Sequence, residues 1–136
     1  MSDVILLGTG EGALYADMLD GFLDKTGEEV ELYRVMCKEE YLSIIETGNK
    51  FIEYEYSMSG KWFATCHSDA EKWGKLFYKT QDYCIVVITV LANALKYMFY
   101  LRMLDNIGPA YSADVVLLNK IVRRVRLYEK DCKSKN

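Results

Sequence analysis

The sequence predicts an α+β domain, and two observations lead to this prediction. Short segments with alternating or continuous apolar residues, typical of strands, are interspersed with segments whose apolar residues recur at helical spacing. A chain of 136 residues, 51% of them hydrophobic, is long enough to form one core of its own. No internal repeat divides it. We therefore expect a single compact domain with a small sheet and flanking helices.

The first 29 residues are expected to form an N-terminal helical segment. Residues 4–7 are either a strand or the beginning of the first helix. The helix itself is predicted over 11–25, where the apolar residues share one face, and Thr26-Gly27 ends it. Residues 30–136 then make up the rest of the domain.

The remaining elements follow from apolar periodicity and from the residues that end each segment. Strands are predicted over 30–36, 51–56, 62–65 and 83–90. Helices are predicted over 38–47, 69–78, 91–104 and 114–125. Ser68 is the expected N-cap of the helix over 69–78. The turn at 105–109, which contains Gly108-Pro109, separates the last two helices.

Charge is distributed unevenly along the chain, although the net charge is only −3. Acidic residues dominate 1–31, and basic residues dominate 120–135. The two ends are solvated faces, or the C-terminal stretch is a basic helix that contacts an acidic protein partner or a phosphate backbone. The overall excess of acidic residues argues against nucleic-acid binding by the whole domain.

Several other classes of protein are disfavoured by residue types and spacing. The cysteines have no CxxC spacing and there is one histidine, so we expect no metal site. The N-terminus is acidic, unlike a signal peptide. The longest apolar run, over 85–95, is too short to span a bilayer. We expect a cytoplasmic location, or delivery into the cytoplasm of a target cell.

The opening "VILLGTGEGALY" contains Gly8-x-Gly10-x-x-Ala13, which is similar to a dinucleotide-binding loop. Such a fold also requires an acid at the end of the second strand and further βα units. The acids 28–31 precede or begin that strand, and the rest of the chain offers no second mononucleotide-binding half. We interpret the glycines as a structural turn that leads into a helix at Glu11.

Three later segments carry a resemblance to a known family. They are "LYRVM" at 32–36, "GKWFATCHSDAEKWGK" at 60–75 and "LDNIGPAYSADVVLLNK" at 104–120. In this order they resemble the ADP-ribosyltransferase-like C-terminal toxin domains of bacterial polymorphic (RHS-type) toxins, over roughly residues 30–125. The resemblance implies a small split sheet with flanking helices and a site for NAD. If the chain is a domain of a longer toxin, residues 1–29 are a connecting segment.

The resemblance also implies roles for particular residues. Arg34 matches the first-strand residue that contacts the NAD phosphate or ribose, a task that suits a permanently charged guanidinium. Thr65 would donate a hydroxyl to the nicotinamide pocket, and Trp62 or Phe63 would provide a stacking surface. Since a strand sends neighbours to opposite faces, one of these two aromatic residues is expected in the core. Tyr33 and Tyr111 complete the expected nucleotide-binding set.

The sequence differs from the family at the position of the catalytic carboxylate. Such transferases use a late Glu that stabilises positive charge on the ribose as nicotinamide leaves. No Glu lies between Glu71 and Glu129. Asp114 is the best candidate in that interval, with helix capping as its alternative role. Glu55 belongs to the pattern Glu53-x-Glu55, which resembles that of the family. However, it precedes the segment 60–75, contrary to the order of motifs in the family.

Two classes of function therefore stay open. The chain is an enzyme that cleaves the nicotinamide–ribose bond of NAD and passes ADP-ribose to an acceptor. Alternatively it is a catalytically degenerate module that binds a nucleotide or a protein, either sequestering a signal or acting as an immunity or adaptor protein. Nucleotide binding without turnover, or a stable protein complex without nucleotide affinity, would separate these alternatives.

Overall fold

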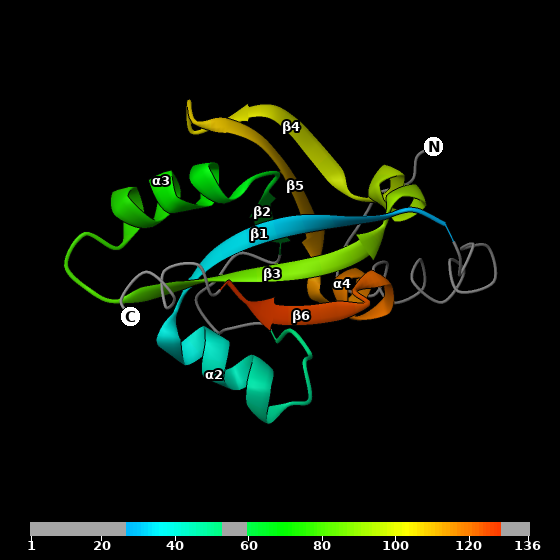
Figure 1. Cartoon of the computed structure of the whole chain (residues 1–136), viewed down its shortest axis with the longest axis horizontal. Coiled ribbons are helices and arrows are strands. Elements are labelled where there is room, and N and C mark those ends of the chain that lie inside the picture. The colour runs from blue at the N-terminus through cyan, green and yellow to red at the C-terminus, as the bar shows by residue number, and fades with distance from the viewer. Residues whose placement is uncertain (1–26, 53–59, 129–136) are drawn as a thin grey trace.

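The computed structural model describes residues 27–52 and 60–128, and these form a mixed α+β domain (Figure 1). Its strands are β1 (Glu29–Cys37), β2 (Gly60–Ala64), β3 (Tyr83–Leu91), β4 (Phe99–Leu104), β5 (Gly108–Asp114) and β6 (Arg124–Leu127). Its helices are α2 (Lys38–Glu46), α3 (His67–Phe77) and α4 (Val115–Ile121), with a 3₁₀ segment, η1 (Ala92–Tyr97).

The strands form one open sheet of six, in the order β4-β5-β2-β1-β3-β6, with every neighbouring pair antiparallel. β1 and β3 pair along their whole length, from Glu29↔Leu91 to Cys37↔Tyr83. β1 and β2, in contrast, share the single pair Tyr33↔Ala64. The sheet is therefore joined at its centre by one bridge, and β5 runs steeply across the direction of β1 and β3 (Figure 1).

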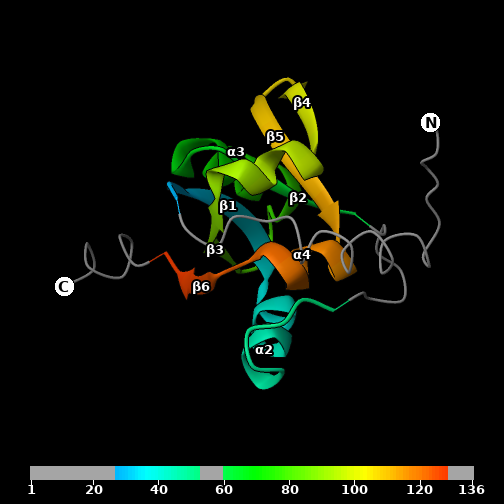
Figure 2. The same cartoon turned by 90° about the vertical axis from the view of Figure 1, so that its right-hand side faces the viewer.

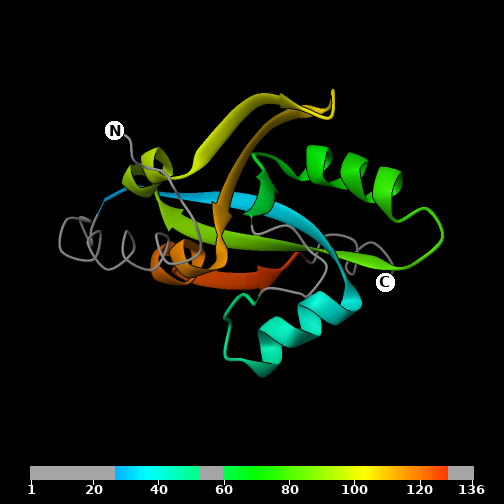
Figure 3. The same ribbon diagram turned by 180° about the vertical axis from the view of Figure 1, so that it is seen from behind.

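Helices cover both faces of the sheet. α3 lies on one side of β1 and β3, and α2 lies on the other (Figures 1 and 2). α4 lies close to β6, on the same side as α2 (Figure 3). The α3 face buries Ala70 and Trp73 against Ala64, Ile85 and Ala110.

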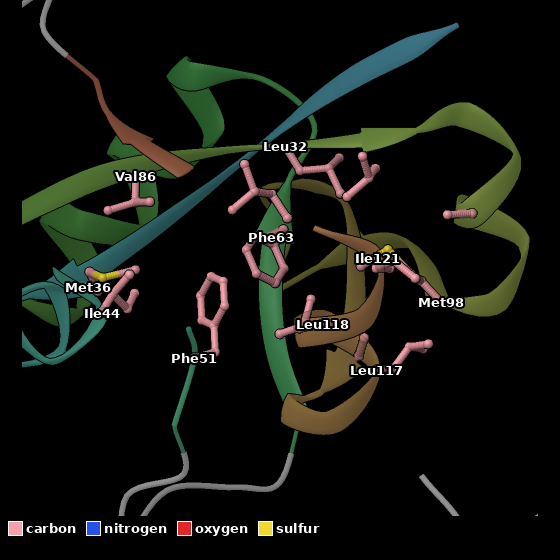
Figure 4. Close-up of a cluster of buried hydrophobic side chains, with 14 residues drawn as sticks. Leu32, Met36, Ile44, Phe51, Phe63, Val86, Met98, Leu117, Leu118 and Ile121 are labelled. Atoms are coloured by element: carbon pink, nitrogen blue, oxygen red, sulfur yellow. The ribbon is translucent and has the colours of Figure 1, made fainter. Parts of the chain in front are cut away.

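The larger core cluster fills the α2/α4 face, where apolar residues of the strands meet those of both helices (Figure 4). Phe63 is fully buried there, and its ring meets that of Phe51 edge-to-face with centroids 5.9 Å apart. Asn119 of α4 accepts from the Phe51 backbone N–H and donates to the Phe51 carbonyl, at 2.8 and 3.0 Å. These contacts fix the segment after α2 against α4.

The helix predicted over 91–104 is wrong. Only η1 is helical there, and Phe99–Leu104 forms the edge strand β4 against β5. β5 itself begins at Gly108, inside the predicted turn, whose observed part is Asp105–Ile107. A register shift between Leu101 and Leu104 accommodates Pro109, which cannot donate to the ladder. The aromatic residues Phe99 and Tyr100, a type enriched in strands, thus pair in a ladder once β5 provides a partner.

The prediction that the last helix continues to residue 125 and carries the basic residues is also wrong. α4 ends at Ile121, and Arg124–Leu127 forms β6 on the free edge of β3. Exposure alternates along this strand, with Arg124 and Arg126 outward, a period that suits a strand. Both arginines pair with carboxylates of β1: Arg124 with Glu29 at 2.6 Å and Arg126 with Glu31 at 3.0 Å. Two arginines of the basic stretch are therefore engaged in ion pairs with β1, and the expected contact with an acidic partner stays a prediction.

Other predictions are confirmed or lie outside the description. The strands over 30–36 and 83–90 and the helix over 38–47 are confirmed within a residue or two. The helix after residue 67 is confirmed, but Cys66, not Ser68, occupies the N-cap position. The glycine-rich opening, the helix over 11–25 and most of the strand over 51–56 lie outside the described residues; Phe51 and Ile52 are not in a strand.

Candidate functional site

Arg34 lies on β1 beside the single bridge between β1 and β2, with its side chain on the α2/α4 face. Its Nε donates to Glu40 Oε2 at 2.9 Å, and its Nη2 donates to Glu40 Oε1 at 3.2 Å. Its Nη1 donates to the backbone carbonyl of Trp62 at 3.1 Å. The guanidinium is therefore held in a two-pronged ion pair and also connects β1 to β2.

Glu40 is the centre of a buried charge cluster. Lys61 of β2 places its Nζ 3.5 Å from the same Glu40 oxygen that Arg34 Nε binds. The side chains of Lys61, Glu40 and Arg34 are 2%, 8% and 17% exposed. We name these three residues the charge cluster. Burial at this level is costly for ions unless they are paired, and here a carboxylate lies against two cations.

Tyr78, at the end of α3, is near the charge cluster. Burial is the largest cause that raises the pKa of its hydroxyl above the usual value. Among the charged neighbours that act on it, Arg34 lowers this pKa and Glu40 raises it. The hydroxyl therefore stays protonated at neutral pH.

Two predicted site residues, Tyr33 and Trp62, lie on the opposite face. Tyr33 meets the ring of Tyr128 edge-to-face at 6.2 Å, and His67 stacks on Tyr128 at 3.9 Å. Burial, with the nearby Glu31 carboxylate, raises the pKa of Tyr33. Trp62 is half-buried and meets Phe99 edge-to-face at 5.9 Å.

Phe63 and Tyr111 occupy the same face as Arg34. They are register partners on β2 and β5. Phe63 lies in the core, with the Arg34 guanidinium carbon 6.0 Å from its ring centroid, so of the two neighbouring aromatics it is the one buried, as predicted for one of them. Tyr111 packs against Tyr100 with ring centroids 4.9 Å apart. Thr65 follows β2 in a bend and is half-buried.

Asp114 has a structural role in this fold. Its Oδ1 accepts from the backbone N–H of Leu117 at 2.8 Å, which caps the N-terminus of α4. Because side chains alternate along β5, Asp114 is on the same face of the sheet as Ser112 and on the opposite face from Tyr111. Glu55 lies outside the described residues. Of the described carboxylates, the one in contact with Arg34 is Glu40.

The structure thus brings Arg34, Phe63 and Tyr111 to one face and separates them from Tyr33 and Trp62. The residues that sequence analysis missed are Glu40 and Lys61. A usable signal existed for Lys61, because strand alternation places it on the same face as Phe63. No such signal existed for Glu40, because the sequence does not tell which of the neighbouring Glu39 and Glu40 faces the sheet from α2.

Within residues 27–52 and 60–128, no group of three or more metal-ligating side chains comes together. In the same part of the chain no helix is long and apolar enough to cross a membrane. No protein-family model matches the chain, and neither a curated protein nor a solved structure gives a significant match.

Proposed function

We propose that this chain is an ADP-ribosyltransferase-like domain that binds NAD, or a related phosphate-bearing nucleotide, at Arg34. The observation that carries the proposal is the geometry of Arg34. Glu40 and the Trp62 carbonyl fix its guanidinium, and the side chain keeps 17% of its surface exposed. Its remaining N–H groups have no acceptor among the described residues. A preorganised, partly exposed guanidinium suits phosphate recognition.

The sheet supports the same proposal. β1 and β2 share only the Tyr33↔Ala64 pair, so the strands that carry Arg34 and Phe63 separate on either side of it. Such a separation is what a split sheet of the ADP-ribosyltransferase type requires. On its β3 side Arg34 pairs with Val86, and on its β2 side it directly follows the Tyr33↔Ala64 pair, so its cation lies next to the point where β1 and β2 diverge.

Binding without transfer is the form of this function that the described residues favour. Transfer needs a carboxylate aimed at the ribose as nicotinamide leaves. Glu40 is engaged by Arg34 and Lys61, and Asp114 caps α4. Turnover, if measured, would therefore direct attention to Glu55.

The test is a titration of NAD against the folded chain, with Arg34→Lys as the variant and Arg124→Lys as its control. Lysine keeps the charge but cannot bind a phosphate through two parallel N–H···O bonds. Arg124 is also paired to a glutamate, but it is 62% exposed on β6, far from β2 in the strand order. We expect at least about a tenfold loss of affinity for Arg34→Lys, equal to about 1.4 kcal/mol, and none for the control. Equal affinities in all three proteins would overturn the proposal.

A protein-binding function is the second candidate, and edge strand β4 is the observation that favours it. Phe99, Tyr100 and Met103 are 61%, 47% and 57% exposed there. Aromatic residues and methionine are enriched at protein interfaces, and an edge strand offers unpaired backbone groups. Sedimentation of the wild type and of Phe99→Ser over a range of concentrations tests the simplest case, self-association through β4. A sedimentation coefficient that is independent of concentration in both proteins would exclude it.

A further inference from the structure

The charge cluster joins three separate elements at one point. Arg34 comes from β1, Lys61 from β2 and Glu40 from the first turn of α2. The two cations meet the same carboxylate oxygen, at 2.9 Å and 3.5 Å. The Glu40 carboxylate therefore contacts side chains of both β1 and β2, close to the Tyr33↔Ala64 pair that joins these strands.

A carboxylate and a phosphate group are bound by arginine in the same way, through two parallel N–H···O bonds. The Arg34–Glu40 pair has this arrangement, with Nε and Nη2 each donating to a different oxygen. An ammonium on the second side supplies the point charge that commonly completes an oxyanion site. The carboxylate of Glu40 therefore lies where the oxyanion of a ligand would lie.

We infer that Arg34 and Lys61 form an oxyanion-binding site and that Glu40 is its built-in occupant, which a ligand must displace. The ligand class is a single carboxylate- or phosphate-sized oxyanion, free or carried by a nucleotide. The inference rests on the proposed function for its assignment to a nucleotide phosphate, and on the charge cluster alone for the existence of the site. It adds Lys61 as a binding residue and makes Glu40 a competitor of the ligand.

Chemical rescue tests the site directly. Glu40→Ala removes the carboxylate that lies against the buried ammonium of Lys61 and the partly exposed guanidinium of Arg34. We expect formate, acetate or inorganic phosphate to raise the thermal midpoint of this variant by about 4 °C or more above the value in sodium chloride of equal ionic strength, at an anion concentration about tenfold above its Kd. If the variant is unfolded in chloride, recovery of native circular dichroism in formate is the equivalent result.

The matched control is Glu39→Ala, which removes the neighbouring, exposed glutamate of α2. General effects of these anions on stability act on both variants, so the difference between them is the measured quantity. Equal shifts in both, or no recovery of Glu40→Ala in any anion, would overturn the inference. Adding Lys61→Met to Glu40→Ala should abolish the rescue; rescue that persists would remove Lys61 from the site.

The outcomes also separate this inference from the proposed function. Rescue by formate or phosphate together with no NAD binding by the wild type leaves the oxyanion site standing and rejects the nucleotide. NAD binding by the wild type without rescue of Glu40→Ala supports the nucleotide and makes Glu40 a positioning residue for Arg34. If both hold, NAD should bind Glu40→Ala at least about tenfold more tightly than wild type, because the internal competitor is gone.

Discussion

The guanidinium of Arg34 donates from Nη1 to the backbone carbonyl of Trp62 across the point where β1 and β2 cease to pair, at 3.1 Å. A carbonyl left without a donor in the interior is costly. Here an arginine side chain from one strand supplies the hydrogen bond to the other, and Glu40 holds that arginine in place. Arg34, which we expect to bind a ligand, therefore also connects β1 to β2 and α2.

This double role predicts that Arg34→Ala is strongly destabilising. The substitution leaves Glu40 and the Trp62 carbonyl without the donors that Arg34 provides, and we expect a loss of about 3–5 kcal/mol in the free energy of unfolding. Urea denaturation followed by circular dichroism measures it. Arg124→Ala is the control, since its ion pair with Glu29 lies on the surface and should contribute little. Similar losses in both variants would show that the charge cluster contributes no more to the free energy of unfolding than a surface ion pair does.

Asp114 is expected to act as a helix cap. Asp114→Ala removes the acceptor for the Leu117 N–H and should lower the free energy of unfolding by about 1 kcal/mol. Asp114→Asn retains a capping oxygen, so most of that stability should remain while the charge is lost. Chemical denaturation of the three proteins checks this order. If the wild type releases nicotinamide from NAD and Asp114→Asn does not, Asp114 is catalytic and this interpretation is wrong.

Gly108 is required because a buried carboxylate lies against it. A Cβ at this position would overlap Oδ2 of Asp69, and Asp69 is only 9% exposed. We expect Gly108→Ala to cost about 1–3 kcal/mol, as overpacking does. The double variant Gly108→Ala with Asp69→Ala should lose less than the sum of the single variants. Strict additivity in this double-mutant cycle would contradict the contact.

Cys84 and Cys66 are predicted to differ in reactivity. Burial raises the pKa of the Cys84 thiol from 9.0 to about 11, whereas Cys66 is exposed. At pH 8.5 iodoacetamide should therefore alkylate Cys66 well before Cys84, as peptide mass mapping would show. The same shift has a consequence for stability. The folded state holds the Cys84 proton more tightly, so its contribution is complete below pH 9.0 and is lost as pH rises towards about 11.

Cys84→Ser provides the comparison for that pH dependence. Its free energy of unfolding should fall less steeply than that of the wild type between pH 9 and 11. Parallel slopes for the two proteins, or equal alkylation rates for Cys66 and Cys84, would contradict the assignment.

Segments with strong local periodicity were predictable. The run Tyr83–Leu91 is rich in β-branched residues and forms β3, and the helix starting at His67 has its apolar residues on one face. Arg34 was a candidate because it matches by position the first-strand arginine of the family that the sequence resembles, and the structure places it on strand β1. The capping role of Asp114 was the stated alternative, and the structure shows that cap.

What could not be predicted depends on partners distant in sequence. Phe99–Leu104 has a helical pattern until β5 offers it a ladder, and Arg124–Leu127 becomes a strand because β3 has a free edge. Likewise, Glu40 of α2 contacts Lys61 of β2, 21 residues later in the sequence, only because the fold brings α2 against the sheet. These are tertiary effects, which local propensity does not contain.

The most direct test of nucleotide binding is proton NMR of NAD mixed with the purified, folded chain. The account predicts broadened NAD resonances in the presence of wild type, weaker broadening with Arg34→Lys, and no free nicotinamide signal. Sharp NAD resonances at millimolar ligand and protein concentrations near 0.1 mM would contradict the central claim, because complexes with Kd up to about 1 mM would be visible.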